Sequence, residues 1–353
     1  MQALVVRPGE AHSTRVADVP PLLLADGEVA VRTLEVGVCG TDREISEGLF
    51  GVAPEGDDVL VLGHEFLGVV ERDGLGFTRG ELVTAIVRRS CEHCLACGEG
   101  APDSCLTGDY SERGITRLHG FARELVAEDS TQLIRIPNSL GRLGVLVEPT
   151  SICERAIRHA RAIGNRQPWA LQRALVIGAG AIGMLSTYLL RLGGLDVWTA
   201  ARGPADDPRA RLVTASGARY VSTETEPLAA LREEVGGFDL VVEATGDAQV
   251  MADSIGMLRR SGVACLLGLD PRRRTVELEG RVIGVDTILE NRVVFGSVNA
   301  NRVDWVAAVG SLDRALERWP DVLPEFVGLR VPLDRFAEAF DYRGVKATLV
   351  LEG

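Results

Sequence analysis

Four cysteines lie close together in the first third of the chain, in the pattern C-x2-C-x2-C-x7-C. They are Cys91, Cys94, Cys97 and Cys105. Four thiolates at this spacing predict a closed tetrahedral zinc site whose role is structural, because no coordination position is left for a substrate. An iron–sulfur site also uses four cysteines and is the alternative. The segment 91–108 has few apolar side chains, so it needs such a metal to stay folded.

A second group of metal-ligand side chains is dispersed along the chain. Cys39 lies in GVCGTD, His64 and Glu65 lie in GHEFLGVV, and Glu148 lies in VEPTS. Together they offer one thiolate, one imidazole and two carboxylates. A catalytic zinc takes three protein ligands and keeps one position open, so the remaining carboxylate would be an outer or exchanging ligand. Each residue alone is more often structural, and the hypothesis requires that these distant segments meet.

A glycine-rich turn, GAGAIG, spans residues 178–183. It follows an apolar strand and opens an apolar helix, which is the context of a dinucleotide site. Gly178 permits the tight turn, Gly180 lets a pyrophosphate approach the backbone, and Gly183 allows close helix–strand packing. The helix N-terminus offers free N–H groups to the phosphates. We therefore predict cofactor contacts at Gly178, Gly180, Ala181, Ile182 and Gly183; a purely structural turn is the alternative.

The residue that ends the next strand bears on which dinucleotide binds. The strand LDVWTAAR ends in Arg202, and no acid follows until Asp206. A carboxylate at this place binds the ribose 2′-hydroxyl of NAD, whereas an Arg pairs with the 2′-phosphate of NADP. We predict NADP as the cofactor, with NAD as the second candidate. A solvated surface Arg is the alternative.

Composition excludes several classes of function. The chain has 353 residues, 50 acidic against 38 basic, and a net charge of -12. So acidic a surface argues against binding to nucleic acid or to an anionic membrane. No apolar run reaches the roughly 18 residues of a membrane span, and the N-terminus lacks a signal-peptide pattern. We expect a cytoplasmic protein whose clustered cysteines bind metal.

The hydrophobic pattern predicts two folding units. Up to residue 90, short strands broken by Gly, Pro and Asp predict a barrel-like all-β unit, with a half-buried strand from Glu28 and two apolar runs from Asp57. From residue 155, strands alternate with helices, which predicts an α/β unit with a parallel sheet. The stretch from Gly328 adds a helix and a final strand.

These motifs make the chain similar to the zinc-dependent medium-chain dehydrogenases/reductases over nearly its whole length. The matching residues are CGTD from Cys39, GHE from Gly63 with Gly68, the four cysteines and the GAGAIG turn. Within that superfamily the chain most resembles the glucose (aldose) 1-dehydrogenase branch. The segments that carry this resemblance are CGTDREI from Cys39, YSERGI from Tyr110, VEPTSICERAI from Val147 and FGSVNANRVDW from Phe295.

The resemblance implies an α/β protein with a GroES-like β-barrel catalytic domain and a Rossmann cofactor domain, a doubly wound parallel sheet. We expect the catalytic domain over residues 1–154, with the zinc lobe at 91–105, and the Rossmann domain over 155–299. Residues 300–353 would return to the catalytic domain, and the active site would lie between the two. The resemblance also implies a homo-oligomer, a dimer or tetramer, joined through edge strands of the cofactor domain, with RVVFGSV as the candidate edge.

The same resemblance implies roles for individual residues. Cys39 and His64 would hold the catalytic zinc, and Glu65 or Glu148 would supply the third contact, directly or through water. Thr41 would hydrogen-bond the reacting hydroxyl. The residues implied for the sugar are Glu112, Glu148, Glu154 and Asn299; those implied for the cofactor are Arg202, Thr245, Gly268 and Asn299. The branch often carries two arginines at 202 and 203, but residue 203 is Gly, so use of both NADP and NAD is the alternative to NADP alone.

The predicted reaction transfers a hydride from C1 of an aldose to C4 of NADP+ and gives a lactone. Several carboxylates suit a polyhydroxylated substrate, because each accepts charge-assisted hydrogen bonds. Alcohol dehydrogenases often carry a relay His where this chain has Glu44, so the proton would leave through Thr41, water or a carboxylate. The alternatives are a zinc polyol or secondary-alcohol dehydrogenase, an enzyme of modified-sugar biosynthesis, and a non-catalytic nucleotide sensor.

Overall fold

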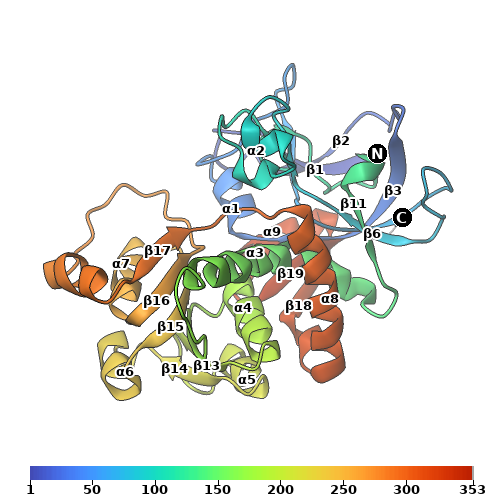
Figure 1. Ribbon diagram of the computed structural model, residues 1–353. Helices are drawn as coiled ribbons and strands as arrows, with labels where there is room; N and C mark the ends of the chain where they lie inside the picture. The colour runs from blue at the N-terminus through green and yellow to red at the C-terminus, as the bar shows by residue number, and fades with distance from the viewer. Residues whose placement is uncertain (352–353) are drawn as a thin grey trace. The chain divides into compact units, whose positions relative to one another are not determined.

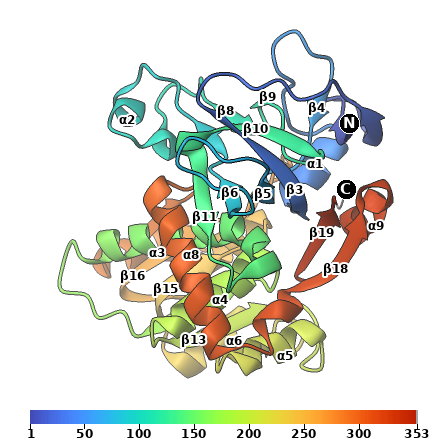
Figure 2. The same cartoon turned by 90° about the vertical axis from the view of Figure 1, so that its right-hand side faces the viewer.

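The computed structural model describes residues 1–351 (Figures 1 and 2). Residues 352 and 353, the end of the segment expected to return to the catalytic domain, lie outside the described residues. The chain forms two compact units. Unit 1 holds residues 1–151, 299–313 and those from 324 on, and unit 2 holds residues 152–298 and 314–323. Residues 314–323, which the sequence analysis assigns to the catalytic domain, thus group with unit 2 by their contacts.

Unit 1 is built mainly of antiparallel strands. Its largest sheet has the order β11-β6-β5-β3-β19-β18, and β10 pairs with the first half of β3. These strands are β3 (Glu28–Val38), β5 (Glu65–Val70), β6 (Leu82–Ala85), β10 (Leu125–Asp129), β11 (Leu133–Ile136), β18 (Val327–Pro332) and β19 (Lys346–Val350). Smaller sheets are formed by β1 (Gln2–Val6), β2 (Arg15–Asp18) and β4 (Leu60–Val61), and by β7 (Arg88–Arg89), β8 (Ser111–Arg113) and β9 (Arg117–Leu118). The predicted barrel-like strand unit is confirmed, except that the range expected to hold only strands also contains a short helix, α1 (Gly40–Ser46).

The register of the central strands brings their functional ends together. Strand β3 runs antiparallel to β5 and to β19, so Gly37 pairs with Glu65 at the start of β5 and Val38 pairs with Ala347 near the start of β19. A β-carbon at Gly37 would lie 1.9 Å from Oε2 of Glu65, so only glycine fits there. The end of β3 and the starts of β5 and β19 therefore lie side by side.

Unit 2 contains one parallel sheet in the order β14-β13-β12-β15-β16-β17. The strands are β12 (Arg173–Ile177), β13 (Asp196–Ala201), β14 (Arg219–Ser222), β15 (Phe238–Glu243), β16 (Leu258–Leu266) and β17 (Val293–Gly296). Every residue of β15 is buried, as expected where both faces of a parallel sheet are covered. The predicted doubly wound sheet is confirmed, and its order reverses between β12 and β15, where such sheets bind ligands.

Helices cover the sheet of unit 2. Helix α4 packs on β12 and β13, α7 packs on β15 and β16, and α5 packs on β14. The α-helices in the described part of the chain are α1 (Gly40–Ser46), α2 (Leu95–Gly98), α3 (Val147–Gly164), α4 (Ala181–Leu192), α5 (Pro208–Ala215), α6 (Leu228–Val235), α7 (Ala248–Gly256), α8 (Arg302–Arg318) and α9 (Phe336–Asp341). Among residues 1–351, no helix is long and apolar enough to cross a bilayer.

Candidate metal centres and cofactor site

Cys39 is fixed in place by the junction of β3 and α1. It is the N-cap of α1, and its backbone N–H donates to Oδ2 of Asp42 at 2.9 Å. Its Sγ in turn accepts the N–H of Thr41 at 3.2 Å. This reciprocal capping box satisfies the free N–H groups at the helix start. These two hydrogen bonds fix the position of the thiol relative to the backbone at the start of α1.

Three predicted ligands converge at this end of the sheet. Nε2 of His64 lies 3.0 Å from Sγ of Cys39, and the ligand atoms of Cys39, His64 and Glu65 all lie within 4.8 Å of one another. His64 and Glu65 are 5% and 2% exposed. One sulfur, one imidazole nitrogen and one carboxylate oxygen at these separations form a donor set that suits zinc. Nδ1 of His64 lies 3.5 Å from Oδ1 of Asp42 on its other side.

Glu65 has a second partner that the sequence analysis missed. Nζ of Lys346 donates to Oε1 and Oε2 of Glu65 at 2.5 and 2.6 Å and to the carbonyl oxygen of Val38 at 3.3 Å. Both side chains are almost completely buried. An unpaired charge is expensive in such surroundings, so the two groups compensate each other. The available signal was a lysine at the start of the apolar run KATLVL, where a charged residue needs a buried partner.

The electrostatics of this cluster depend on mutual charges. Burial opposes the charging of His64, but Cys39 and Asp42 outweigh it and raise the pKa of His64 well above 6.5. Burial also raises the pKa of the Cys39 thiol. A bound metal ion reverses this balance, because a ligating thiol and imidazole both give up their protons.

Glu148 and Glu154 lie on α3, at different places. Glu148, in the first turn, is buried, and this burial raises the pKa of its carboxyl to about 8. It is outside the set of Cys39, His64 and Glu65, although the charge of Glu65 also raises its pKa. Glu154 is partly exposed and belongs to unit 2.

Glu112 and Asn299 are brought together although they are far apart in sequence. Nδ2 of Asn299 donates to Oε1 of Glu112 at 2.7 Å, and Nε of Arg88 donates to the same oxygen at 2.9 Å. Arg88 also stacks on the ring of Tyr110, with its guanidinium carbon 3.8 Å from the ring centre. The carboxylate of Glu112 is therefore held in one orientation by a buried cation.

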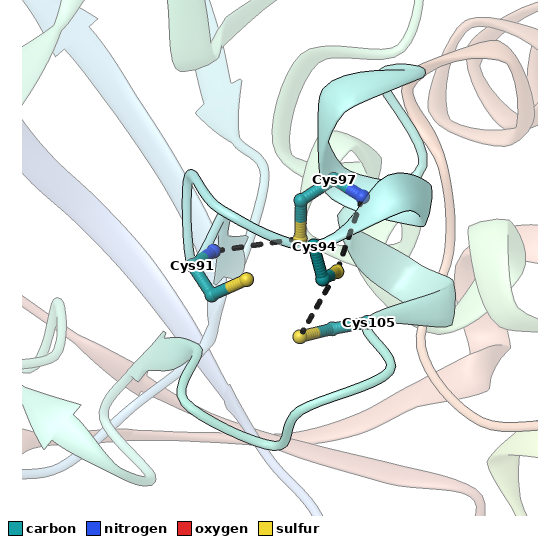
Figure 3. Close-up of side chains that lie close together, drawn as sticks. All are labelled: Cys91, Cys94, Cys97 and Cys105. Atoms are coloured by element: carbon teal, nitrogen blue, oxygen red, sulfur yellow. Dashed lines mark hydrogen bonds between the residues drawn. The ribbon is translucent and has the colours of Figure 1, made fainter.

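The four clustered cysteines surround a common point (Figure 3). Their sulfurs all lie within 4.8 Å of one another, and Sγ of Cys94 is 3.9 Å from Sγ of Cys105. A tetrahedron of zinc–sulfur bonds of about 2.3 Å has edges of roughly 3.8 Å, so the set fits one zinc ion. Sulfurs this close leave no room for a multi-iron cluster. Backbone N–H groups of Cys97 and Leu106 donate to Sγ of Cys94 at 3.4 and 3.5 Å and would stabilise a thiolate.

The GAGAIG turn joins β12 to α4 as predicted. Gly178 has φ of 112°, and Gly183 packs so closely that a β-carbon there would lie 1.9 Å from the carbonyl oxygen of Gly178. Gly180 is the N-cap of α4, and a β-carbon on it would meet no atom within 4 Å. The first helical residues, Ala181 and Ile182, thus follow an open backbone that a pyrophosphate can approach.

The other predicted cofactor residues lie at the same edge of the sheet. A β-carbon at Gly178 would lie 3.3 Å from Cγ2 of Thr245, and one at Gly268 would lie 2.3 Å from the N–H nitrogen of Gly246. Thr245 follows β15, Gly268 follows β16, and Arg202 follows β13. The carboxyl ends of parallel strands share one edge, so these residues border one surface. Glu243 lies buried beneath it and accepts the N–H of Thr245 at 2.7 Å; the sequence analysis missed it.

Models of known families match both parts of the chain. Residues 25–138 match the alcohol dehydrogenase GroES-like domain, and residues 141–352 match the glucose dehydrogenase C-terminus. A GroES-like unit with this metal-ligand set and a Rossmann sheet with the glycine turn, in one chain, define the zinc-dependent medium-chain dehydrogenases/reductases.

Relatives of the whole chain narrow this class. The glucose 1-dehydrogenase of Methanocella arvoryzae is 42% identical over 342 residues, which cover 96% of this chain and 95% of the relative. Glucose 1-dehydrogenase 1 of Caldivirga maquilingensis is 39% identical over 100% of this chain and 99% of its own length. The glucose dehydrogenase of Haloferax mediterranei, solved in complex with NADP, zinc and gluconolactone, superposes with a TM-score of 0.92 at 32% identity and full coverage of both chains. The chain belongs to the glucose dehydrogenase family.

Proposed function

We propose that this chain is a zinc-dependent oxidoreductase that transfers a hydride from C1 of a glucose-like aldose to NADP+ and releases the lactone. The observation that carries the proposal is the convergence of Cys39, His64 and Glu65 within 4.8 Å in a member of the glucose dehydrogenase family. The complex of the Haloferax mediterranei relative with NADP, zinc and gluconolactone supports the same substrate and cofactor classes.

Cys39 and His64 would hold the catalytic zinc, with Glu65 or Glu148 as the third contact. The donor set fits, because sulfur, nitrogen and oxygen ligands are those that catalytic zinc sites use. Both carboxylate oxygens of Glu65 already accept from Lys346, which supports a direct or water-mediated part for Glu148. Cys91, Cys94, Cys97 and Cys105 would hold the structural zinc.

Zinc would act as a Lewis acid on the reacting oxygen, and the nicotinamide would accept the hydride. The protein's own contribution is orientation and proton transfer. The hydroxyl of Thr41 would take the proton of the C1 hydroxyl and pass it to water or to a nearby carboxylate. The other hydroxyls of the sugar would bind to Glu112, Glu148, Glu154 and Asn299. A site built to hydrogen-bond each hydroxyl discriminates against substrates that lack one.

The cofactor would lie on the carboxyl edge of the sheet in unit 2. The N–H groups of the turn at 178–183 would bind the pyrophosphate. Thr245 and Gly268 would border the cofactor, Asn299 would contact the nicotinamide, and Arg202 would face the adenosine ribose. We keep NADP as the preferred cofactor and NAD as the second.

Two further properties belong to this proposal. A homo-oligomer, dimer or tetramer, is supported by β17, which is the last strand in the sheet order and pairs on one side only among residues 1–351. A reducing compartment, the cytoplasm, is supported by the seven cysteines, all of which lie within the described residues and form no disulfide there. Light scattering during gel filtration tests the first property, and fractionation of cells tests the second.

The decisive experiment replaces His64 with Ala. We expect His64→Ala to lose one zinc per chain and to lower kcat about a thousandfold or more, since a metal contributes several kcal/mol to the transition state. The matched control is His119→Ala, because His119 also pairs with an aspartate in unit 1, with Nε2 3.0 Å from Oδ2 of Asp57. The assay follows NADP+ reduction with glucose, galactose, xylose, sorbitol and simple alcohols. Full activity and zinc content in His64→Ala, or turnover of the alcohols alone, would overturn the proposal.

A further inference from the structure

The carboxyl end of β13 carries a fixed loop. In a sheet of this order, the adenosine ribose lies beyond the end of the second strand, here β13. Arg202 and Gly203 follow that strand, and the hydroxyl of Tyr220 donates to the carbonyl oxygens of Arg202 and Gly203 at 3.3 and 3.0 Å. These bonds from β14 hold the loop backbone in one conformation.

A second guanidinium lies against this loop. A β-carbon built on Gly203 would lie 3.0 Å from Oδ2 of Asp207 and 3.6 Å from Nη2 of Arg209. Gly203 has φ of 108°, a conformation that a side chain would strain. The chain therefore places no side chain at position 203, and the space beside it is taken by a cation that comes from six positions later.

Asp207 holds Arg209 in a defined orientation. Nε and Nη2 of Arg209 donate to the two carboxylate oxygens of Asp207 at 3.0 and 2.7 Å, a bidentate pair. Asp207 is also the N-cap of α5 through the backbone N–H of Arg209 at 2.8 Å. The cap needs only this backbone bond, so the guanidinium is not required for it. Within residues 1–351, Nη1 of Arg209 makes no hydrogen bond, and its two donors remain for a ligand.

We propose that Arg209, together with Arg202, binds the 2′-phosphate of NADP. The inference rests on the proposed function for its cofactor site and adds the residue that sets the cofactor preference. Arg202 and Arg209 carry two positive charges and Asp207 carries one negative charge. A net charge of about +1 therefore remains to attract a phosphate.

Direct binding measurements test this assignment without sugar and without turnover. Dissociation constants are measured by calorimetry for NADP+ and NAD+, and for the probes 2′-AMP and 5′-AMP, on the wild type, Arg209→Ala and Arg209→Gln. We expect both variants to bind NADP+ and 2′-AMP at least about tenfold more weakly, since each loses a hydrogen-bonded charge that faces the phosphate. We expect NAD+ and 5′-AMP to bind as in the wild type.

The matched control is Arg219→Ala. Arg219 is the first residue of β14, pairs with Trp198 in the register and stacks on its ring at 4.3 Å, so it lies toward the amino ends of these parallel strands and away from the loop that follows β13. Arg219→Ala removes the same charge and should leave the dissociation constant of every ligand unchanged. Equal weakening of NADP+ and NAD+ in the Arg209 variants, or an unchanged NADP+ to NAD+ ratio, would overturn the assignment. An inactive protein that still distinguishes the two cofactors through Arg209 would contradict the proposed reaction alone.

Discussion

Nδ2 of Asn299 donates a 2.7 Å hydrogen bond to Oε1 of Glu112, the same oxygen that accepts Nε of Arg88. Asn299 adopts φ of 63°, a backbone conformation that asparagine tolerates better than most residues. Two residues later, Nδ2 of Asn301 donates to Oδ1 of Asp103 in the cysteine lobe at 2.9 Å. The segment that enters unit 1 at residue 299 is thus tied both to a candidate sugar ligand and to the structural metal site.

Two substitutions of Glu112 separate its binding role from its structural role. Glu112→Gln keeps an oxygen for Asn299 and Arg88 but loses the charge, so we expect the KM for the sugar to rise about five- to tenfold with little change in kcat. Glu112→Ala leaves the buried guanidinium of Arg88 unpaired and should lower the free energy of unfolding by about 3 kcal/mol. Steady-state kinetics and urea denaturation measure the two effects. Glu99→Gln, at an exposed glutamate of the lobe, should alter neither; an unchanged KM in Glu112→Gln would exclude Glu112 as a sugar ligand.

Replacing Lys346 should expose the cost of the buried charge on Glu65. Lys346→Met leaves the Glu65 carboxylate without its partner at 2.5 Å, and we expect the chelated protein to lose about 3–5 kcal/mol of unfolding free energy. The double variant Glu65→Gln/Lys346→Met should recover most of this loss, because neither charge is then buried alone. The control is Arg335→Met, which breaks an exposed ion pair with Glu338 and should not shift the urea midpoint measurably. A wild-type midpoint for Lys346→Met would refute this account of the pair.

Removing one sulfur from the lobe should abolish only the structural site. Cys94→Ser removes one of the four thiolate ligands. It also removes the sulfur that accepts the N–H groups of Cys97 and Leu106. We therefore expect this variant to lose one zinc per chain, measured by elemental analysis. The thermal midpoint should fall, since the segment has little apolar core of its own. His64→Ala should lose the other zinc and keep the lobe resistant to proteolysis. Loss of both metals in Cys94→Ser would show that the two sites do not fold independently.

The stability of unit 2 should depend on pH through Glu243. Burial raises the pKa of Glu243 above its ordinary value of 4.5, although Thr245 donates to it. A carboxyl whose pKa is higher in the folded protein binds its proton more tightly there. Its contribution to the free energy of unfolding is therefore fully present below pH 4.5 and is lost as the pH rises through the folded pKa. Glu243→Gln cannot ionise, so its unfolding free energy should rise relative to the wild type as the pH increases above 4.5 and through the folded pKa. Urea titrations at several pH values measure the difference; a constant difference would mean that Glu243 titrates normally.

Local patterns were enough to predict the local structures. The glycine turn at 178–183, the strand from Glu28 and the four-cysteine segment are each set by residues near in sequence, through steric demand, alternating burial and ligand spacing. The two units and the parallel sheet followed from the change of hydrophobic period. Their side chains identified Cys39, His64 and Glu65 as candidate metal ligands. That they lie close together was predicted only from the resemblance to the zinc-dependent dehydrogenases.

Only the tertiary structure decided which distant side chains meet. The register of β3 against β5 and β19 places Cys39, Glu65 and Lys346 at one end of the sheet, and a shift by one residue would turn each side chain to the other face. The contact between Glu112 and Asn299 likewise depends on a chain path that closes a long loop. Such contacts form because they lower the free energy of the whole folded unit. That free energy depends on many segments together and cannot be evaluated from one stretch of sequence.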